Sequence, residues 1–361
     1  MRIFILVNLW AIALLMGARS AAAATDNTDS TYRLGSGYTV GETGLSIGGY
    51  ANTELDVPRS TPWNFTLSDL SLFMTWDNGS RLHFFSELEA GDVLNVGNHQ
   101  SLGAQNAHFE FERFYLDSLV NNNLTVRLGK FLTPIGEWNL IHAAPLVWTT
   151  SRPVVTENLF SPHASGLMLH GSVPVVSRQL EYSVFADLTE SIDPYRSSNP
   201  FQNALGAHLR YFFSDTLQIG ASVADYTLSD LQSAQIGSSF THIALSNLQS
   251  SRYYLVGLNL AWSYKKFELS SEFVYRTSDH AAIASTLQGF VQGVVPISQR
   301  WFMVGRYEYF EQQLNKAGQV GLLGLAYRPL PPIVWKLEYR RGEHNELLAP
   351  DGLSASFSIL F

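Results

Sequence analysis

The chain has 361 residues and carries 23 Lys and Arg against 31 Asp and Glu, which gives a formal net charge of −8. An acidic chain is a poor binder of nucleic acid, because that affinity depends on basic side chains that neutralise phosphates. We therefore expect no nucleic-acid partner. There is no cysteine, which excludes disulfides, thiolate metal sites and a cysteine nucleophile.

The N-terminus predicts export. Arg2 precedes an apolar run at residues 4–16, and alanines at residues 22–24 supply the small side chains of a cleavage site. The apolar run is shorter than the ~18 residues that a bilayer span requires. This favours a cleaved signal peptide at residues 1–24 over the alternative, an N-terminal membrane anchor. Removal of the signal peptide takes away Arg2 and Arg19. The mature chain then has 21 basic and 31 acidic residues, a net charge of −10.

Residues 25–40 are polar, and we expect them to form an N-terminal tail in the periplasm. From residue 41 to 361 the chain reads as segments of alternating polarity separated by turns. In one of them, Phe267 and Leu269 flank Glu268. A period of two is the spacing of a β-strand with one apolar and one polar face. We predict sixteen strands, at residues 43–55, 64–76, 80–92, 106–118, 123–132, 164–173, 179–189, 203–213, 216–227, 252–263, 266–277, 284–295, 300–310, 317–328, 333–343 and 352–361.

Two folds are compatible with such strands. In a soluble β-sandwich the apolar faces meet inside, whereas in a membrane barrel they face lipid and the polar faces line the interior. Short turns alternate here with long loops, and Tyr and Trp gather near strand ends, as in the girdles of membrane barrels. We therefore predict an all-β fold, a transmembrane antiparallel β-barrel of sixteen strands at residues 41–361, with no transmembrane helix and no second domain.

The last strand carries apolar residues at alternate positions and ends at Phe361. It resembles the terminal strand that the bacterial outer-membrane assembly machinery recognises. The mature chain is similar in length and turn rhythm to sixteen-stranded bacterial porins. Residues 128–136, LGKFLTPIG, followed by Ser-Arg-Pro at 151–153, resemble the phosphate-selective porins of the O/P type. The resemblance implies a cell outer membrane location, contact with outer-membrane lipid, and a homotrimer.

The connection at residues 133–163 is the third long loop and the one that most departs from the strand rhythm. Loops of this length are usually functional or disordered, and this one is too apolar and aromatic for simple disorder. Leaving Trp138, Trp148 and Phe160 in outside water would be unfavourable. In porins the third loop folds into the lumen and narrows it, and the resemblance implies the same here. The alternatives are an extracellular lid and a latch that contacts a neighbouring subunit.

Polar side chains of this loop are the candidate pore-constriction residues: Glu137, His142, Arg152, Glu157 and His163. Charged residues on the predicted inward faces are the candidate pore lining: Arg81, Glu87, Glu89, Glu110, Glu112, Arg127, Arg210, Arg306, Lys336 and Arg340. The four glutamates could form an acidic patch, and the last three cations a basic ladder. Opposed patches would set a field that steers charged solutes. The alternative is that these charges pair with each other across strands.

Motifs for other chemistry are sparse. His142 and His163 lie too far apart in the sequence to claim a metal site. We expect no enzymatic activity, catalytic residue, metal or cofactor. The predicted function is passive diffusion of small hydrophilic solutes, charged ones among them, through a water-filled channel. The alternatives are a structural or adhesive outer-membrane barrel with a blocked lumen, and an outer-membrane hydrolase.

Overall fold

The computed structural model describes residues 31–98, 100–188, 201–228, 233–236, 239–244, 252–280, 283–312 and 316–361. The predicted signal peptide, and residues 25–30 of the predicted tail, lie outside this part of the chain. None of the described helices is long and apolar enough to cross a membrane.

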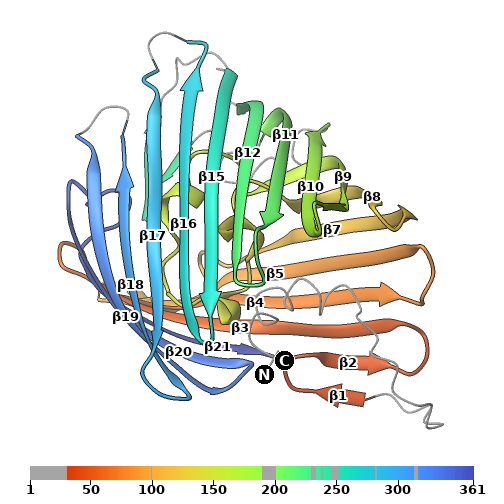
Figure 1. Ribbon diagram of the computed structural model, residues 1–361. Coiled ribbons are helices and arrows are strands. Elements are labelled where there is room, and N and C mark those ends of the chain that lie inside the picture. The colour runs from red at the N-terminus through yellow and green to blue at the C-terminus, as the bar shows by residue number, and fades with distance from the viewer. Residues whose placement is uncertain are drawn as a thin grey trace.

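Sixteen long antiparallel strands in the described residues form a closed barrel (Figure 1). Each strand pairs with the next along the chain, and β21 pairs with β3, with Leu353 opposite Val57. The predicted all-β barrel of sixteen strands is confirmed. The strands are β3 (Leu45–Pro58), β4 (Asn64–Asp77), β5 (Leu82–Gly97), β7 (His108–Asn121), β8 (Leu124–Leu132), β9 (His163–Val175), β10 (Arg178–Asp187), β11 (Phe201–Phe212), β12 (Leu217–Leu228), β15 (Arg252–Tyr264), β16 (Phe267–Ser278), β17 (Thr286–Pro296), β18 (Trp301–Phe310), β19 (Gly318–Leu330), β20 (Ile333–Glu343) and β21 (Gly352–Leu360).

Five short strands accompany the barrel. β1 (Thr31–Arg33) and β2 (Gly37–Val40) form a hairpin that pairs with β3, so the described part of the predicted tail is a folded addition to the sheet. Its tight turn requires glycine, because Gly35 has a φ of 84°. β6 (Gln100–Gly103) pairs with β5, and β13 (Ser233–Ile236) pairs with β14 (Ser239–Ala244) in a separate sheet.

The two faces of the wall differ in polarity. Along β18, Trp301 and Tyr307 are 41% and 52% exposed, whereas Arg306 is 3% exposed. The apolar side chains thus point outward and the charged one points inward, the reverse of a soluble protein. This is the arrangement of a barrel surrounded by lipid.

The connections at the two ends of the barrel differ in length. One end carries the tight turns at residues 78–81, 122–123, 176–177, 213–216, 265–266, 297–300 and 331–332. The other carries the longer connections at 59–63, 98–107, 133–162, 188–200, 229–251, 279–285, 311–317 and 344–351. This is the asymmetry that the sequence predicts. The predicted strand ends also agree closely with the structure, except that β5 continues beyond residue 92 to Gly97.

The connection between β8 and β9, residues 133–162, contains three 3₁₀ helices: η1 (Trp138–Leu140), η2 (Ala144–Leu146) and η3 (Val154–Thr156). We call this connection the long loop. It lies inside the barrel, because it forms hydrogen bonds with inward side chains of β11, β16, β18 and β20. Trp138 is buried and packs edge-on against Phe290 of β17, with ring centroids 5.7 Å apart.

Candidate functional site

Inward carboxylates hold the backbone amides of the long loop. Irregular backbone buried inside a protein needs hydrogen-bond partners, because an unpaired buried N–H group costs about 1–3 kcal/mol. The barrel wall supplies them at 2.6 to 3.2 Å: Glu272 accepts from Glu137 and Trp138, Glu338 from Thr150 and Ser151, and Glu308 from Val154.

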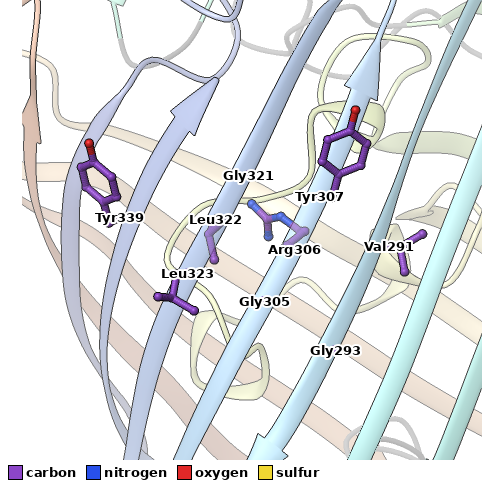
Figure 2. A pocket seen from close by; sticks show the side chains of 9 residues that line it. All are labelled: Val291, Gly293, Gly305, Arg306, Tyr307, Gly321, Leu322, Leu323 and Tyr339. Atoms are coloured by element: carbon purple, nitrogen blue, oxygen red, sulfur yellow. The ribbon is translucent and has the colours of Figure 1, made fainter. Parts of the chain in front are cut away.

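Inward cations hold the backbone carbonyls of the same loop. At distances of 2.9 to 3.1 Å, Lys336 donates to the carbonyls of Ala144 and Thr149, Arg328 to that of Pro145, Arg306 to that of Ser151, and Arg276 to that of Leu159. Arg306 and Lys336, two members of the predicted basic ladder, are therefore buried beneath the loop. In Figure 2 the side chain of Arg306 extends from β18 towards the loop behind it. The third member, Arg340, lies beside Glu338 and Asp56.

The four glutamates of the predicted acidic patch lie together on β5 and β7. Glu89 is directly opposite Glu110 in the strand register. One carboxylate oxygen from each of Glu89, Glu110 and Glu112 lies within 4.8 Å of the others. Glu87 is instead neutralised by Arg113, whose Nε donates to it at 2.6 Å. Acidic side chains thus gather on one side of the interior.

Arg113 is an inward residue that strict alternation assigns to the outer face. Glu87 pairs with Arg113 and Leu88 with Phe111, so an extra residue at Glu112 forms a β-bulge and both polar side chains point inward. The sequence contains a signal for this bulge. Phe111 and Phe114 are both exposed on the outer face but lie three residues apart, which period two does not allow.

His142 and His163 come together beside the acidic side chains. His142 Nε2 is 3.6 Å from carboxylate oxygens of both Glu89 and Glu112, and His163 Nε2 contacts Glu112. Burial alone would lower the pKa of His142, but the negative charges of Glu112 and Glu89 raise it to about 9. The folded chain therefore brings together two histidines that the sequence keeps far apart.

Glu137 is tied to the opposite side of the wall. It accepts a hydrogen bond from Arg210 Nη1 at 2.7 Å and from Asn259 Nδ2 at 3.2 Å, and His208 Nε2 lies 3.7 Å away. Burial opposes ionisation, but Arg210 and His208 hold the pKa of Glu137 below its usual range. Of the other constriction candidates, Arg152 is half-buried, like Glu137, His142 and His163, and Glu157 is exposed.

The two remaining pore-lining candidates, Arg127 and Arg81, lie on a strand and in a turn, respectively. Arg127 lies on the wall in a two-pronged pair with Asp117, at 2.7 and 2.8 Å. Arg81 lies in the exposed turn just before β5, which begins at Leu82, so its inward orientation stays a prediction.

A hollow of about 520 Å³ lies in the outer face of β17 to β19 (Figure 2). Gly293, Gly305 and Gly321 form its floor, since no side chain fills the space above them. Tyr307 and Leu323 stand at its sides. The hollow is open and mostly apolar.

Comparison with known proteins identifies the fold. No model of a known protein family matches the chain. An uncharacterized protein of Aquifex aeolicus strain VF5 is 22% identical over 357 aligned residues, covering 88% of this chain and 80% of that protein.

Three solved structures share the architecture. An anion-selective porin from Comamonas acidovorans matches with a TM-score of 0.58 and 11% identity, covering 88% of this chain and 98% of its own. OmpF of Salmonella typhi, in complex with daunomycin, matches with a TM-score of 0.59 and 11% identity, covering 89% of this chain and 98% of its own. OmpT of Vibrio cholerae, in a trimer form, matches with a TM-score of 0.56 and 10% identity, covering 88% of this chain and 99% of its own. This chain therefore has the barrel fold of outer-membrane porins.

Proposed function

We propose that this protein is an outer-membrane porin, a water-filled channel for the passive diffusion of small hydrophilic solutes. The observation that carries the proposal is the long loop, bonded within a closed barrel to both the acidic and the basic side chains of its inner wall. A loop held in this way narrows the lumen. A barrel of sixteen strands is wide enough to leave an aqueous channel beside it. Arg152, which is half-buried, and Glu157, which is exposed, are the proposed constriction residues.

We further propose a preference for cations. Carbonyl groups of the long loop cover Arg306 and Lys336, which leaves fewer cationic side chains facing the water. The cluster of Glu89, Glu110 and Glu112 lies on the other side. Glu89 and Glu112 are buried beside His142 and His163, and Glu110 is the partly exposed member of the cluster. A negative field at a narrow passage concentrates cations and repels anions. This differs from the resemblance to phosphate-selective porins, which favours anions.

Electrical recording from single channels tests the porin function. Purified protein in planar lipid bilayers should give discrete conductance steps. A salt gradient across the same bilayer should give a reversal potential of the sign expected for cations. Absence of steps, from protein whose folded state is verified by heat-dependent electrophoretic mobility, would rule out the channel.

The second candidate is a structural or adhesive barrel with a blocked lumen. One observation favours it: the long loop contacts β11, β16, β18 and β20, and thus several sides of the wall. The conductance measurement separates the two functions. A blocked barrel gives no current in the wild type and acquires it when residues 140–158 are replaced by a short linker.

The surroundings of the barrel complete the proposal. We propose that outer-membrane lipid covers the apolar outer face, and that the barrel forms a homotrimer. The terminal residue Phe361 exchanges backbone hydrogen bonds of 2.8 Å with Gly49, which seals the C-terminal strand into the barrel. We propose that the outer-membrane assembly machinery recognises this strand. Chemical crosslinking in intact outer membranes should give a species of three chains.

A further inference from the structure

A cluster of metal-ligating side chains lies where the long loop meets the wall. His142 comes from the loop, His163 is the first residue of β9, and Glu112 lies on β7. One donor atom from each of the three lies within 4.8 Å of the others. His142 Nε2 is 3.6 Å from Glu112 Oε2, and His163 Nε2 contacts the same oxygen.

The separation of His142 from Glu112 suits a small divalent ion, whereas His163 Nε2 and Glu112 Oε2 lie closer than two ligands of one ion and would have to move apart to bind it. In tetrahedral zinc sites nitrogen and oxygen donors lie about 2.0–2.2 Å from the metal, so two donors are roughly 3.4 Å from each other. The 3.6 Å between His142 and Glu112 is close to that value. Two imidazoles with carboxylate oxygen form a donor set that suits Zn²⁺ and related transition metals better than Mg²⁺ or Ca²⁺, which prefer oxygen donors alone.

Two buried atoms of the cluster face each other. Glu112 is 4% exposed. Its Oε2 atom contacts Nε2 of His163, and neither atom has a hydrogen bond of normal geometry to any described residue. An ion between these two atoms and His142 Nε2 would give all three a ligand bond once the carboxylate and the imidazole move apart.

A fourth donor is held in place next to this volume. Glu89 Oε2 lies 3.6 Å from His142 Nε2. It accepts hydrogen bonds from Tyr50 at 2.9 Å and from Ser71 at 2.8 Å. Outer-shell hydrogen bonds of this kind fix the orientation of metal ligands.

Rigid structure positions most of the donor set. Glu89 and Glu112 lie on paired strands, and His163 pairs with Leu132 in the β8–β9 ladder. Only His142 comes from irregular backbone. An ion bound by all four side chains would therefore fasten the loop to a preformed part of the wall.

We propose that Glu112, His142 and His163, with Glu89 as fourth donor, bind one divalent transition-metal ion of the Zn²⁺ class. The ion ties the long loop to the β5–β7 side of the barrel. Lys336 and Arg306 hold the same loop on the β18–β20 side. The site would be present whether or not the barrel conducts ions.

The test uses full-length mature protein, purified in detergent without a polyhistidine tag and freed of metal with a chelator. Titration calorimetry with zinc chloride, together with elemental analysis after dialysis, should show one Zn²⁺ per chain. His142→Gln and His163→Gln should each weaken binding at least about tenfold, since even outer-shell changes cost 10–100-fold. His83→Gln is the matched control, because His83 lies near Asp77 at a tight turn and outside the cluster.

A second measurement does not depend on the variants folding normally. Wild-type protein loaded with Co²⁺ should show the intense visible absorption of tetrahedral cobalt, and excess Zn²⁺ should abolish it. Wild-type protein that binds no metal at stoichiometric concentration overturns the proposal. So does Zn²⁺ binding that persists unchanged in both histidine variants, which would show an adventitious ion only. Neither result bears on conductance, so the channel function is tested separately.

Discussion

Arg306 on β18 binds Ser151 of the long loop through two hydrogen bonds, from Nη1 to the backbone carbonyl at 3.0 Å and from Nη2 to Oγ at 2.7 Å. The same guanidinium donates from Nε to Glu308 at 2.8 Å. Glu308 in turn accepts the backbone amide of Val154. One wall cation and one wall anion thus fix the acceptor and donor groups of the same stretch of loop.

Arg306→Met should detach this stretch. The substitution keeps side-chain length but leaves Glu308 as a buried charge without its partner, a change that costs about 3–5 kcal/mol when one member of a buried pair is removed. We expect a lower urea concentration at the unfolding midpoint, and larger and noisier single-channel currents. Arg300→Met is the control, because Arg300 lies in an exposed turn.

The inward direction of Arg306 alone would suggest a different effect, a change in ion selectivity. If Arg306 faced open water, its neutralisation would shift the reversal potential towards cations and leave channel size unaltered. Since Arg306 is 3% exposed and bonded to the loop, conductance should change first. A shifted reversal potential with unchanged conductance and noise would contradict the role of Arg306 as a loop anchor.

Glu272→Ala should loosen the loop at its other end. One oxygen of Glu272 accepts the amides of both Glu137 and Trp138 at 2.6 Å. Its loss leaves two buried N–H groups unpaired, at about 1–3 kcal/mol each. Limited proteolysis should then cut within the loop faster than in the wild type. Glu272→Gln retains an acceptor oxygen and should restore most of the resistance, and equal cleavage of the two variants would contradict this account.

Features of the fold that depend on neighbouring residues can be predicted from the sequence, whereas contacts between residues far apart in the chain cannot. Strand positions follow from alternation, because lipid and water on opposite sides of the wall demand a period of two. The rule fails locally at Glu112, where the bulge turns Arg113 inward. It also places Arg81 on a strand, whereas the tight turn extends to that residue.

The loop contacts could not be predicted in this way. The amide of Thr150 bonds to Glu338, 188 residues further along the chain, and no local pattern encodes such a partner. The same holds for His142 and His163, whose separation in sequence argued against a metal site. Both were predicted as constriction residues, but their proximity to Glu112 follows from the pairing of β7, β8 and β9 and from the inward path of the long loop.

Gly136→Ala should destabilise the protein through two separable effects. Gly136 has a φ of 67°, in the left-handed region, where a side chain costs about 1–2 kcal/mol. A Cβ atom there would also lie 2.2 Å from a carboxylate oxygen of Glu272. Gly79 is a matched control, because its φ is 78° but nothing lies within 4 Å of the added atom. Gly136→Ala should therefore lower the unfolding midpoint in urea more than Gly79→Ala, and equal shifts would contradict the predicted clash.

Low pH should release the loop at Glu137. Arg210 and His208 lower the pKa of Glu137 in the folded protein, so its ion pair stabilises the folded state above the ordinary glutamate pKa of about 4.3. That contribution is lost as pH falls through the lowered folded value. Proteolytic cleavage of the loop by an acid-active protease should therefore increase below about pH 4.

Glu137→Gln separates this effect from general acid unfolding. The amide cannot titrate, so the variant should be cleaved at pH 6 faster than the wild type and should show a shallower increase as the pH is lowered. The remaining charged contacts of the loop, such as Lys336 with Thr149, are common to both proteins. Parallel pH profiles for the two proteins would mean that the pair of Glu137 and Arg210 does not hold the loop, whereas convergence of the profiles at low pH is the expected result.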